Sequence, residues 1–112
     1  MSLLHQDLTK EKWQSLSFFY QMANIGSEIG RTITWKKKDL QKSNASFERG
    51  IELLDLTIED KKNRIGKLKE LCVLREVLVD YFTGEDTYGF SDKDFNDYFY
   101  GFNYAAAISC GA

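Results

Sequence analysis

The sequence lacks proline and holds little histidine or cysteine, and each of these absences excludes something. Among 112 residues there are no prolines, one histidine and two cysteines. Because proline disrupts helix interiors, its absence favours long, uninterrupted helices. The lone His5 argues against histidine-based metal sites, Glu-x-x-His di-iron bundles and Cys–His nucleophiles. Cys72 and Cys110 are too few and too far apart for a disulfide framework, so we expect reduced thiols in a cytoplasm.

Long apolar runs and a strong net charge are absent as well. No run approaches the roughly 20 apolar residues of a membrane span, and the first ten residues lack the pattern of a secretory signal. The net charge of −2 argues against broad attraction to nucleic acid or anionic lipid. We therefore expect a cytoplasmic protein with neither a membrane nor a nucleic-acid partner.

What the sequence does contain is helical periodicity. Apolar residues recur at helical spacing in four segments, which predict helices over about 8–37, 39–60, 63–82 and 91–109. Short links make successive helices antiparallel neighbours. The prediction is an all-α protein, a four-helix up-and-down antiparallel bundle forming one domain over residues 1–112.

Each later segment has a predicted inward stripe. The inward residues are Leu40, Phe47, Ile51, Leu54 and Ile58 in the second segment, Ile65, Leu68, Cys72, Val79 and Phe82 in the third, and Phe95, Phe99, Phe102 and Ala106 in the fourth. Ser91 and Asp94 have the spacing of a capping box, and Phe90 and Phe95 that of a hydrophobic staple.

The stretch "MANIGSEIGR" (22–31) puts Gly26 and Gly30 inside the first predicted helix, where each glycine costs roughly 1 kcal/mol relative to alanine. Helical phase places both glycines on the inward face with Phe19, Ala23 and Ile33. The same phase turns Glu28, Gln21, Asn24 and Arg31 outward. A close packing contact with the aromatic fourth helix is the first explanation. A small-molecule pocket and a homodimer seam are the alternatives.

The apolar arc of this first helix is wide. Phe18, Ile25 and Ile29 lie well round from Leu16 and Tyr20. A helix that is apolar over so wide an arc is either central or covered by a partner. This favours a homodimer, although a loop or the N-terminal segment would also cover the extra face.

An acidic stripe follows the second predicted helix at Glu48, Glu52, Asp55 and Glu59. Such carboxylates can hold Mg²⁺ together with nucleotide phosphates. The "ELLD" stretch (52–55) is similar to the ExxD half-motif of all-α nucleoside triphosphate pyrophosphohydrolases, whose second half is an ExxE pair on the preceding helix. Here that helix offers only Glu28 followed by Arg31. A solvated acidic face paired with lysines is the simpler interpretation.

Arg75 falls inside the apolar sector predicted for the third helix. A buried arginine needs a partner, and Asp55, Glu52 or a tyrosine hydroxyl on a facing helix would serve. The interpretations are a structural ion pair, an arginine at a dimer seam, or an anion site.

Basic residues gather in two clusters, Lys36, Lys37, Lys38 and Lys42 in one and Lys61, Lys62, Arg64, Lys67 and Lys69 in the other. An up-and-down bundle places these clusters at opposite ends. They therefore cannot form one nucleic-acid footprint.

Four stretches together resemble a family of small prokaryotic all-helical proteins of unassigned function. They are "FYQMANIGSEIGR", "FERGIELLDLTI", "LKELCVLREVLVDYF" and "YFYGFNYAAA". The resemblance covers most of residues 18–107. It implies a prokaryotic, cytoplasmic, helical protein and supplies no catalytic residue.

The function expected from the sequence is non-enzymatic: a helical bundle that acts through protein–protein contacts as a homodimer, without a cofactor. The alternative is a Mg²⁺-dependent nucleotide-binding or pyrophosphohydrolase-like enzyme that uses the acidic stripe.

Overall fold

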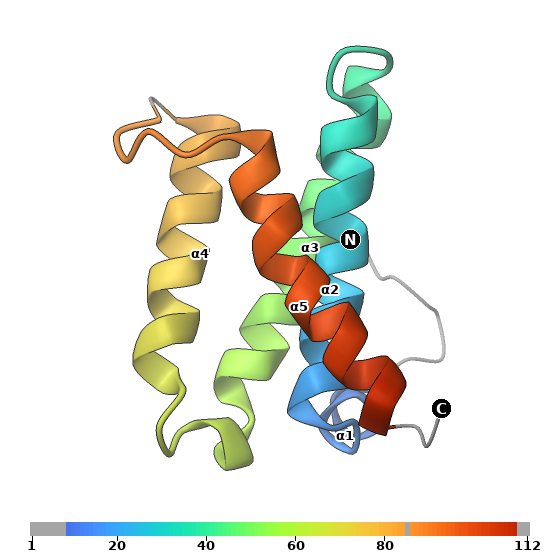
Figure 1. Ribbon diagram of the computed structural model, residues 1–112, viewed down its shortest axis with the longest axis vertical. Coiled ribbons are helices and arrows are strands. Elements are labelled where there is room, and N and C mark those ends of the chain that lie inside the picture. Colours follow the sequence, from blue (N-terminus) through green and yellow to red (C-terminus); the bar gives the residue numbers. More distant parts are fainter. Residues whose placement is uncertain (1–8, 85, 110–112) are drawn as a thin grey trace.

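The computed structural model describes residues 9–84 and 86–109, and these residues form helices and connecting turns without a strand. The elements are α1 (Lys10–Gln14), α2 (Phe18–Trp35), α3 (Leu40–Glu59), the 3₁₀ turn η1 (Lys61–Asn63), α4 (Leu68–Thr83) and α5 (Asp92–Ser109). Successive long helices alternate in direction from α2 to α5 (Figure 1). None of the described helices has the length and apolar character that crossing a membrane requires.

Ser17 interrupts the helix predicted over 8–37, so that prediction is wrong. Its backbone is extended, and its Oγ accepts a hydrogen bond from the Tyr20 amide (3.2 Å) as the N-cap of α2. Serine favours this position because its hydroxyl satisfies an amide at the helix start. The break lets α1 fold back, so Trp13 is only 3% exposed. The predicted helix start at residue 8 lies outside the described residues, as do His5 and Cys110.

α2 is the central helix. It packs most extensively on α3 and next most on α5. Met22, Ile25 and Ile29 are at most 1% exposed. Because two helices cover α2, its wide apolar arc is explained within one chain and does not require a partner.

The face of α2 that is buried in the structure differs from the face that the sequence predicts. Phe19, expected at the centre of the buried face, is 43% exposed, whereas Gln21 and Glu28, expected outside, are buried. The prediction used the spacing of apolar residues, which gives no sign of buried polar side chains. Gln21 and Glu28 are buried because Gln21 is hydrogen-bonded and Glu28 is ion-paired within the protein.

Small residues let α3 approach α2 closely. Ser43, Ser46 and Gly50 are buried on α3. The Ser43 hydroxyl donates to the Thr32 carbonyl (2.9 Å), and a Cβ added to Gly50 would lie 3.3 Å from Ile29 Cδ1. Of the predicted α3 stripe, Leu54 is fully buried, while Leu40 is 65% exposed. Phe47, Ile51 and Ile58 are half-buried against the core.

α4 starts later than predicted and buries a different stripe. Gly66 has a φ of +85°, which separates η1 from the helix that begins at Leu68. The buried residues of α4 are Leu71, Leu74, Val77 and Leu78. The predicted stripe is therefore wrong: Ile65 and Leu68 are 86% and 37% exposed, Cys72 is exposed, and Val79 and Phe82 are half-buried. α4 carries two apolar stripes, and the one with more large aliphatic residues faces the core.

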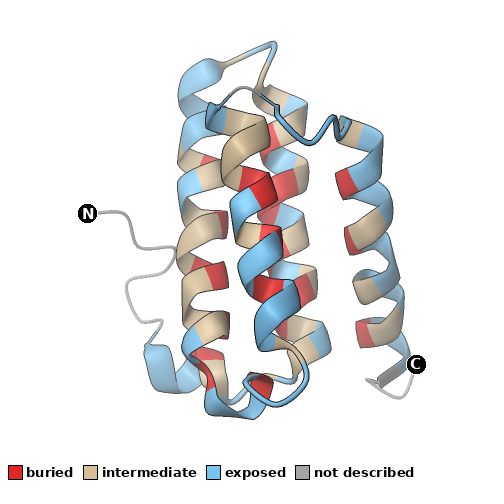
Figure 2. Ribbon diagram, turned by 90° about the vertical axis from the view of Figure 1, so that its left-hand side faces the viewer, coloured by how far each residue is buried: buried red, intermediate tan, exposed pale blue. Residues whose placement is uncertain are grey.

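α5 follows the sequence prediction closely. Phe95, Phe99 and Ala106 are buried, and Phe102 packs against the core. The Ser91 amide donates to Asp94 Oδ2 (2.8 Å) and the Asp94 amide to Ser91 Oγ (3.2 Å), which confirms the capping box. The Phe90 and Phe95 rings lie 5.6 Å apart, which confirms the staple. Buried positions lie on the inward sides of the helices (Figure 2).

Candidate functional site

A groove between α4 and α5 is a prominent concave feature of the described residues. It has a volume of about 360 Å³. Its lining residues are Glu70, Val73, Leu74 and Val77 from α4 and Phe90, Asp94, Phe95 and Tyr98 from the α5 side. The lining is largely apolar, with two carboxylates and one phenol. We call this feature the α4–α5 groove.

The start of α5 fixes the upper wall of the groove. The capping box aligns the first turn of α5, and the staple holds the Phe90 ring against Phe95. Phe90 nevertheless stays 39% exposed, and Val73 on the opposite wall is 52% exposed. The groove therefore presents apolar surface to water on both sides.

Two carboxylates stand at the edge of this apolar surface. The Tyr98 hydroxyl donates to Glu70 Oε2 (2.5 Å), which links α5 to α4. Asp94 is engaged by Ser91. Within residues 9–84 and 86–109, no lysine or arginine nitrogen lies within 4 Å of either carboxylate. Burial, and then the bond to Glu70, raises the pKa of the Tyr98 phenol, so it remains a donor at physiological pH.

A polar cluster joins α2, α4 and α5 beside the start of α5. Lys36 Nζ lies 2.6 Å from Asp92 Oδ1, and the Tyr81 hydroxyl donates to the same oxygen (2.7 Å). Burial raises the pKa of the Asp92 carboxyl, but the hydrogen bonds from Lys36 and Tyr81 outweigh it, so the net pKa is lowered. This cluster fixes the spacing of the three helices where α4 and α5 are connected.

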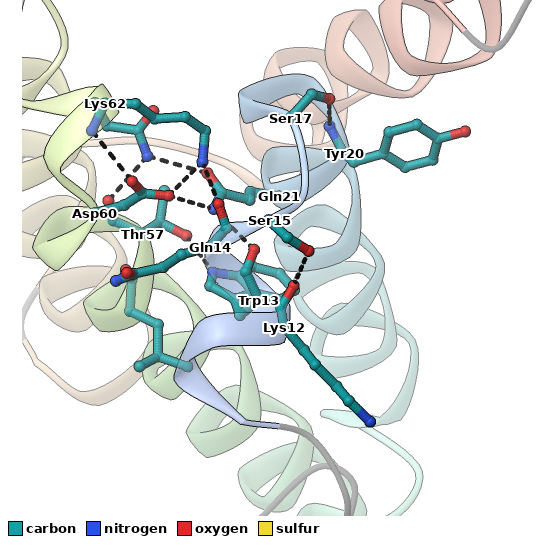
Figure 3. A network of polar contacts seen from close by, with 12 residues as sticks. Lys12, Trp13, Gln14, Ser15, Ser17, Tyr20, Gln21, Thr57, Asp60 and Lys62 are labelled. Carbon is teal, nitrogen blue, oxygen red and sulfur yellow. Dashed lines mark hydrogen bonds and ion pairs between the residues drawn. The ribbon is translucent and has the colours of Figure 1, made fainter.

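A second polar network closes the opposite end (Figure 3). The Trp13 indole donates to Thr57 Oγ1 (3.0 Å), and Gln21 Nε2 donates to Asp60 Oδ2 (3.0 Å) and to the Trp13 carbonyl (3.1 Å). Asn63 Nδ2 donates to Gln21 Oε1 (3.0 Å). Burial raises the pKa of Asp60, but hydrogen bonds from Lys62 and Gln21 lower it further than burial raises it. The network binds α1, α2 and η1 to the end of α3.

The predicted acidic stripe stays dispersed. Glu48 is exposed and Glu52 is half-buried. Asp55 pairs with Arg75 (2.7 Å), and Glu59 pairs with Lys10 (2.9 Å). In the described part of the chain, no three His, Cys, Asp or Glu side chains come together as a metal site would need. The buried Glu52 Oε1 has no hydrogen-bond partner among the described residues.

The two glycines of α2 occupy different environments. A Cβ added to Gly26 would lie 2.7 Å from Phe99 Cβ, so α5 packs closely against α2 at Gly26. The packing contact expected at Gly30 is not found, because a Cβ there meets nothing within 4 Å. Gly30 lies beyond the reach of the Phe99 ring that fills the space above Gly26.

The residues proposed to form a dimer seam on α2 also need correction. Ile25 and Ile29 lie inside the core of one chain, at 0% and 1% exposure, so they offer no surface to a partner. Phe18 is half-buried and stacks edge-on against Phe102, with ring centres 5.7 Å apart. A dimer would therefore use another face.

Arg75 is paired but not buried. Its Nε and Nη2 donate to Asp55 Oδ1 (2.7 Å) and Oδ2 (3.4 Å), and both side chains are 43% exposed. The expectation of a buried arginine is wrong because the stripe carrying Arg75 lies at the edge of the α3–α4 contact. The bidentate bond to Asp55 is the main reason that the pKa of Arg75 is raised.

No family model, curated protein or solved structure matches this chain.

Sequence reasoning missed the α4–α5 groove and the buried carboxylate of Glu28. The groove depends on which of two apolar stripes of α4 turns inward, and periodicity alone does not decide that. Glu28 is 8% exposed and faces Arg31 (3.0 Å) and Arg49 (3.5 Å). The signal that could have found it is the glycine at 50, because a small residue on a facing helix leaves room for a large one.

Proposed function

We propose that this protein is non-enzymatic and acts through protein–protein contacts, as a homodimer that uses the α4–α5 groove. The observation that carries this proposal is the apolar lining of the groove, in which Val73 and Phe90 are exposed. Other apolar side chains are exposed elsewhere on the surface, but these two line a concavity, and an apolar concavity is typical of an interaction site.

The wider setting is part of the same proposal. We class α2–α5 as a four-helix up-and-down antiparallel bundle with α1 appended at one end, acting in a prokaryotic cytoplasm. The alternating helix directions support the bundle, and the family resemblance supports the setting. The proposed partners are protein surfaces, without nucleic acid, membrane or cofactor.

The test is the mass of the protein by size exclusion with light scattering at tens of micromolar. We expect a dimer, and we expect Val73→Asp to make it a monomer with the same helical circular dichroism. Leu40→Asp is the matched control, because Leu40 is also exposed (65%) but lies at the start of α3. A monomeric wild-type protein would contradict the homodimer.

The second candidate is the Mg²⁺-dependent nucleotide enzyme, which the unpartnered buried Glu52 Oε1 favours. The nucleotide enzyme is the second candidate because Glu48, Asp55 and Glu59 do not come together with Glu52 in one site. A specific ligand stabilises the folded state by mass action, so a thermal-shift screen with nucleotides, with and without Mg²⁺, distinguishes the two. A Mg²⁺-dependent rise in Tm that Glu52→Gln abolishes would favour the enzyme.

A further inference from the structure

One stripe on α4 runs along the edge of the groove. It consists of Lys69, Val73, Glu76 and Asp80, spaced by four, three and four residues, which places them on one helix face. Lys69 and Glu76 are exposed, and Val73 is 52% exposed. The stripe therefore has an apolar centre with a cation on one side and carboxylates on the other.

The helix dipole of α4 opposes several charges of this stripe. Lys67 and Lys69 lie at the N-terminal end of α4, where the helix dipole disfavours cations, and Asp80 lies in the last turn, where it disfavours anions. α4 has no side-chain hydrogen bond at its N-cap. Among the described residues, neither Lys69 nor Glu76 belongs to an ion pair. Asp80 accepts hydrogen bonds from the Thr87 amide and hydroxyl, and Glu76 accepts one from the Tyr88 hydroxyl, so both carboxylates are bonded within the chain but neither faces a cation among the described residues.

A second copy in the antiparallel direction would supply the opposite charges that the stripe lacks within one chain. A two-fold axis near Val73 would bring the basic start of one α4 against the acidic second half of the other, twice over. Lys69 and Glu76 lie on either side of Val73, so each would meet the other residue of the partner copy. The stripe is complementary to itself, which a surface made for an unrelated protein does not need to be.

We propose that two copies of this chain pack α4 against α4 in antiparallel orientation across the α4–α5 groove, with Lys69 of each copy paired to Glu76 of the other. This inference rests on the proposed homodimer and names its face. Val73 of each copy covers the apolar lining of the groove, and the paired charges fix the direction of the helices.

Charge reversal tests the pairing. Lys69→Glu and Glu76→Lys are each expected to raise the dimer Kd about 10-fold or more, since each places like charges together at two symmetric contacts. An equimolar mixture of the two variants restores opposite charges at both contacts, and so does the double variant. Both are expected to return to within about threefold of the wild-type Kd in sedimentation equilibrium.

Three controls separate this contact from other causes. Lys38→Glu and Glu48→Lys make the same net charge changes at exposed positions outside α4, and we expect an unchanged Kd. Glu76 also accepts a hydrogen bond from the Tyr88 hydroxyl, so Tyr88→Phe shows the effect of losing that bond alone. Circular dichroism confirms that each variant is folded.

The outcomes are distinct. A dimer whose Kd is unchanged by either reversal, or is not restored in the mixture, overturns the antiparallel α4 contact but leaves the proposed function standing. A wild-type monomer over the whole concentration range overturns the homodimer and this inference together. Weakening by single reversals with recovery in the mixture supports the inference.

Discussion

The α2–α3 pair and the α4–α5 pair solve the problem of helix packing in opposite ways. At the α2–α3 seam small residues bring the backbones together, and buried polar groups such as Gln21 and Thr32 are hydrogen-bonded. Between α4 and α5, the Tyr81 and Phe95 rings lie 5.0 Å apart and Tyr98 is bonded to Glu70, but an apolar groove remains beside these contacts. The first pair is closed, whereas the second leaves an apolar groove, which is the surface of the proposed contact.

Under the proposed function, the closed region provides stability and the groove region provides the contact with a partner. Changes at the closed region are expected to lower the free energy of unfolding, whereas changes on the outer stripe of α4 are expected to alter association instead. The following variants test that separation, beginning with the largest effect.

Trp13→Ala is expected to cost the most. It removes a large, 3% exposed side chain and leaves Thr57 Oγ1 without its indole donor, so we expect a loss of about 3–5 kcal/mol in the free energy of unfolding. Urea denaturation measures the loss. Ile65→Ala is the control, because Ile65 is 86% exposed and surface substitutions usually change stability by less than about 0.5 kcal/mol. Equal losses in the two variants would mean that α1 does not stabilise the fold.

Substitution of the two glycines of α2 by alanine is expected to change the free energy of unfolding in opposite directions. Gly26→Ala forces a Cβ against Phe99 and is expected to cost about 1–3 kcal/mol, and Gly26→Leu at least as much. Gly30→Ala has open space and should gain about 0.4–1 kcal/mol from reduced backbone entropy of the unfolded chain. The melting temperatures of the two variants, compared with that of the wild-type protein, measure both changes. A Gly26→Ala variant as stable as wild type would show that α5 packs elsewhere.

Acid should weaken the closed region through Asp60. Its pKa in the folded protein is lowered from the ordinary value of 3.8, so its stabilising contribution is full above that value and is lost as pH falls through the lowered pKa. We expect the free energy of unfolding to fall below about pH 4 and Asp60→Asn to flatten that fall. Asp86→Asn, at an exposed turn, is the control and should keep the wild-type slope.

The start and the buried face of α5 could be predicted from local sequence signals. The break before α2, the buried face of α4 and the burial of Glu28 depend on long-range contacts. The capping box at Ser91 and the staple at Phe90 act within one turn, so the sequence determines them. The break at Ser17 is accompanied by a long-range contact, the hydrogen bond from Trp13 to Thr57, which is 44 residues away in the sequence. The phase of α4 depends on competition between two stripes for one core, and the burial of Glu28 depends on arginines that approach from two helices. These choices are made by tertiary contacts that periodicity does not encode.

Arg75 gives the smallest expected effect and sharpens the contrast between the two regions. If Arg75 were buried, removing it would leave an orphaned carboxylate and cost roughly 3–5 kcal/mol. At 43% exposure for both partners, water solvates Asp55 when Arg75 is absent, so Arg75→Ala and Arg75→Met should each cost no more than about 1 kcal/mol. Added salt should reduce this loss of stability further, because salt screens exposed ion pairs.

Urea denaturation of the two Arg75 variants in low and high salt measures this small effect. Arg49→Met is the buried comparison: it leaves Glu28, whose side chain is 11% exposed, with Arg31 alone, and should cost more and depend less on salt. A loss above about 3 kcal/mol for Arg75→Ala would mean that α4 packs against α3 tightly enough to exclude water from Asp55. The α4 helix would then belong to the closed region, and the division of the molecule into a stable seam and an open groove would fail.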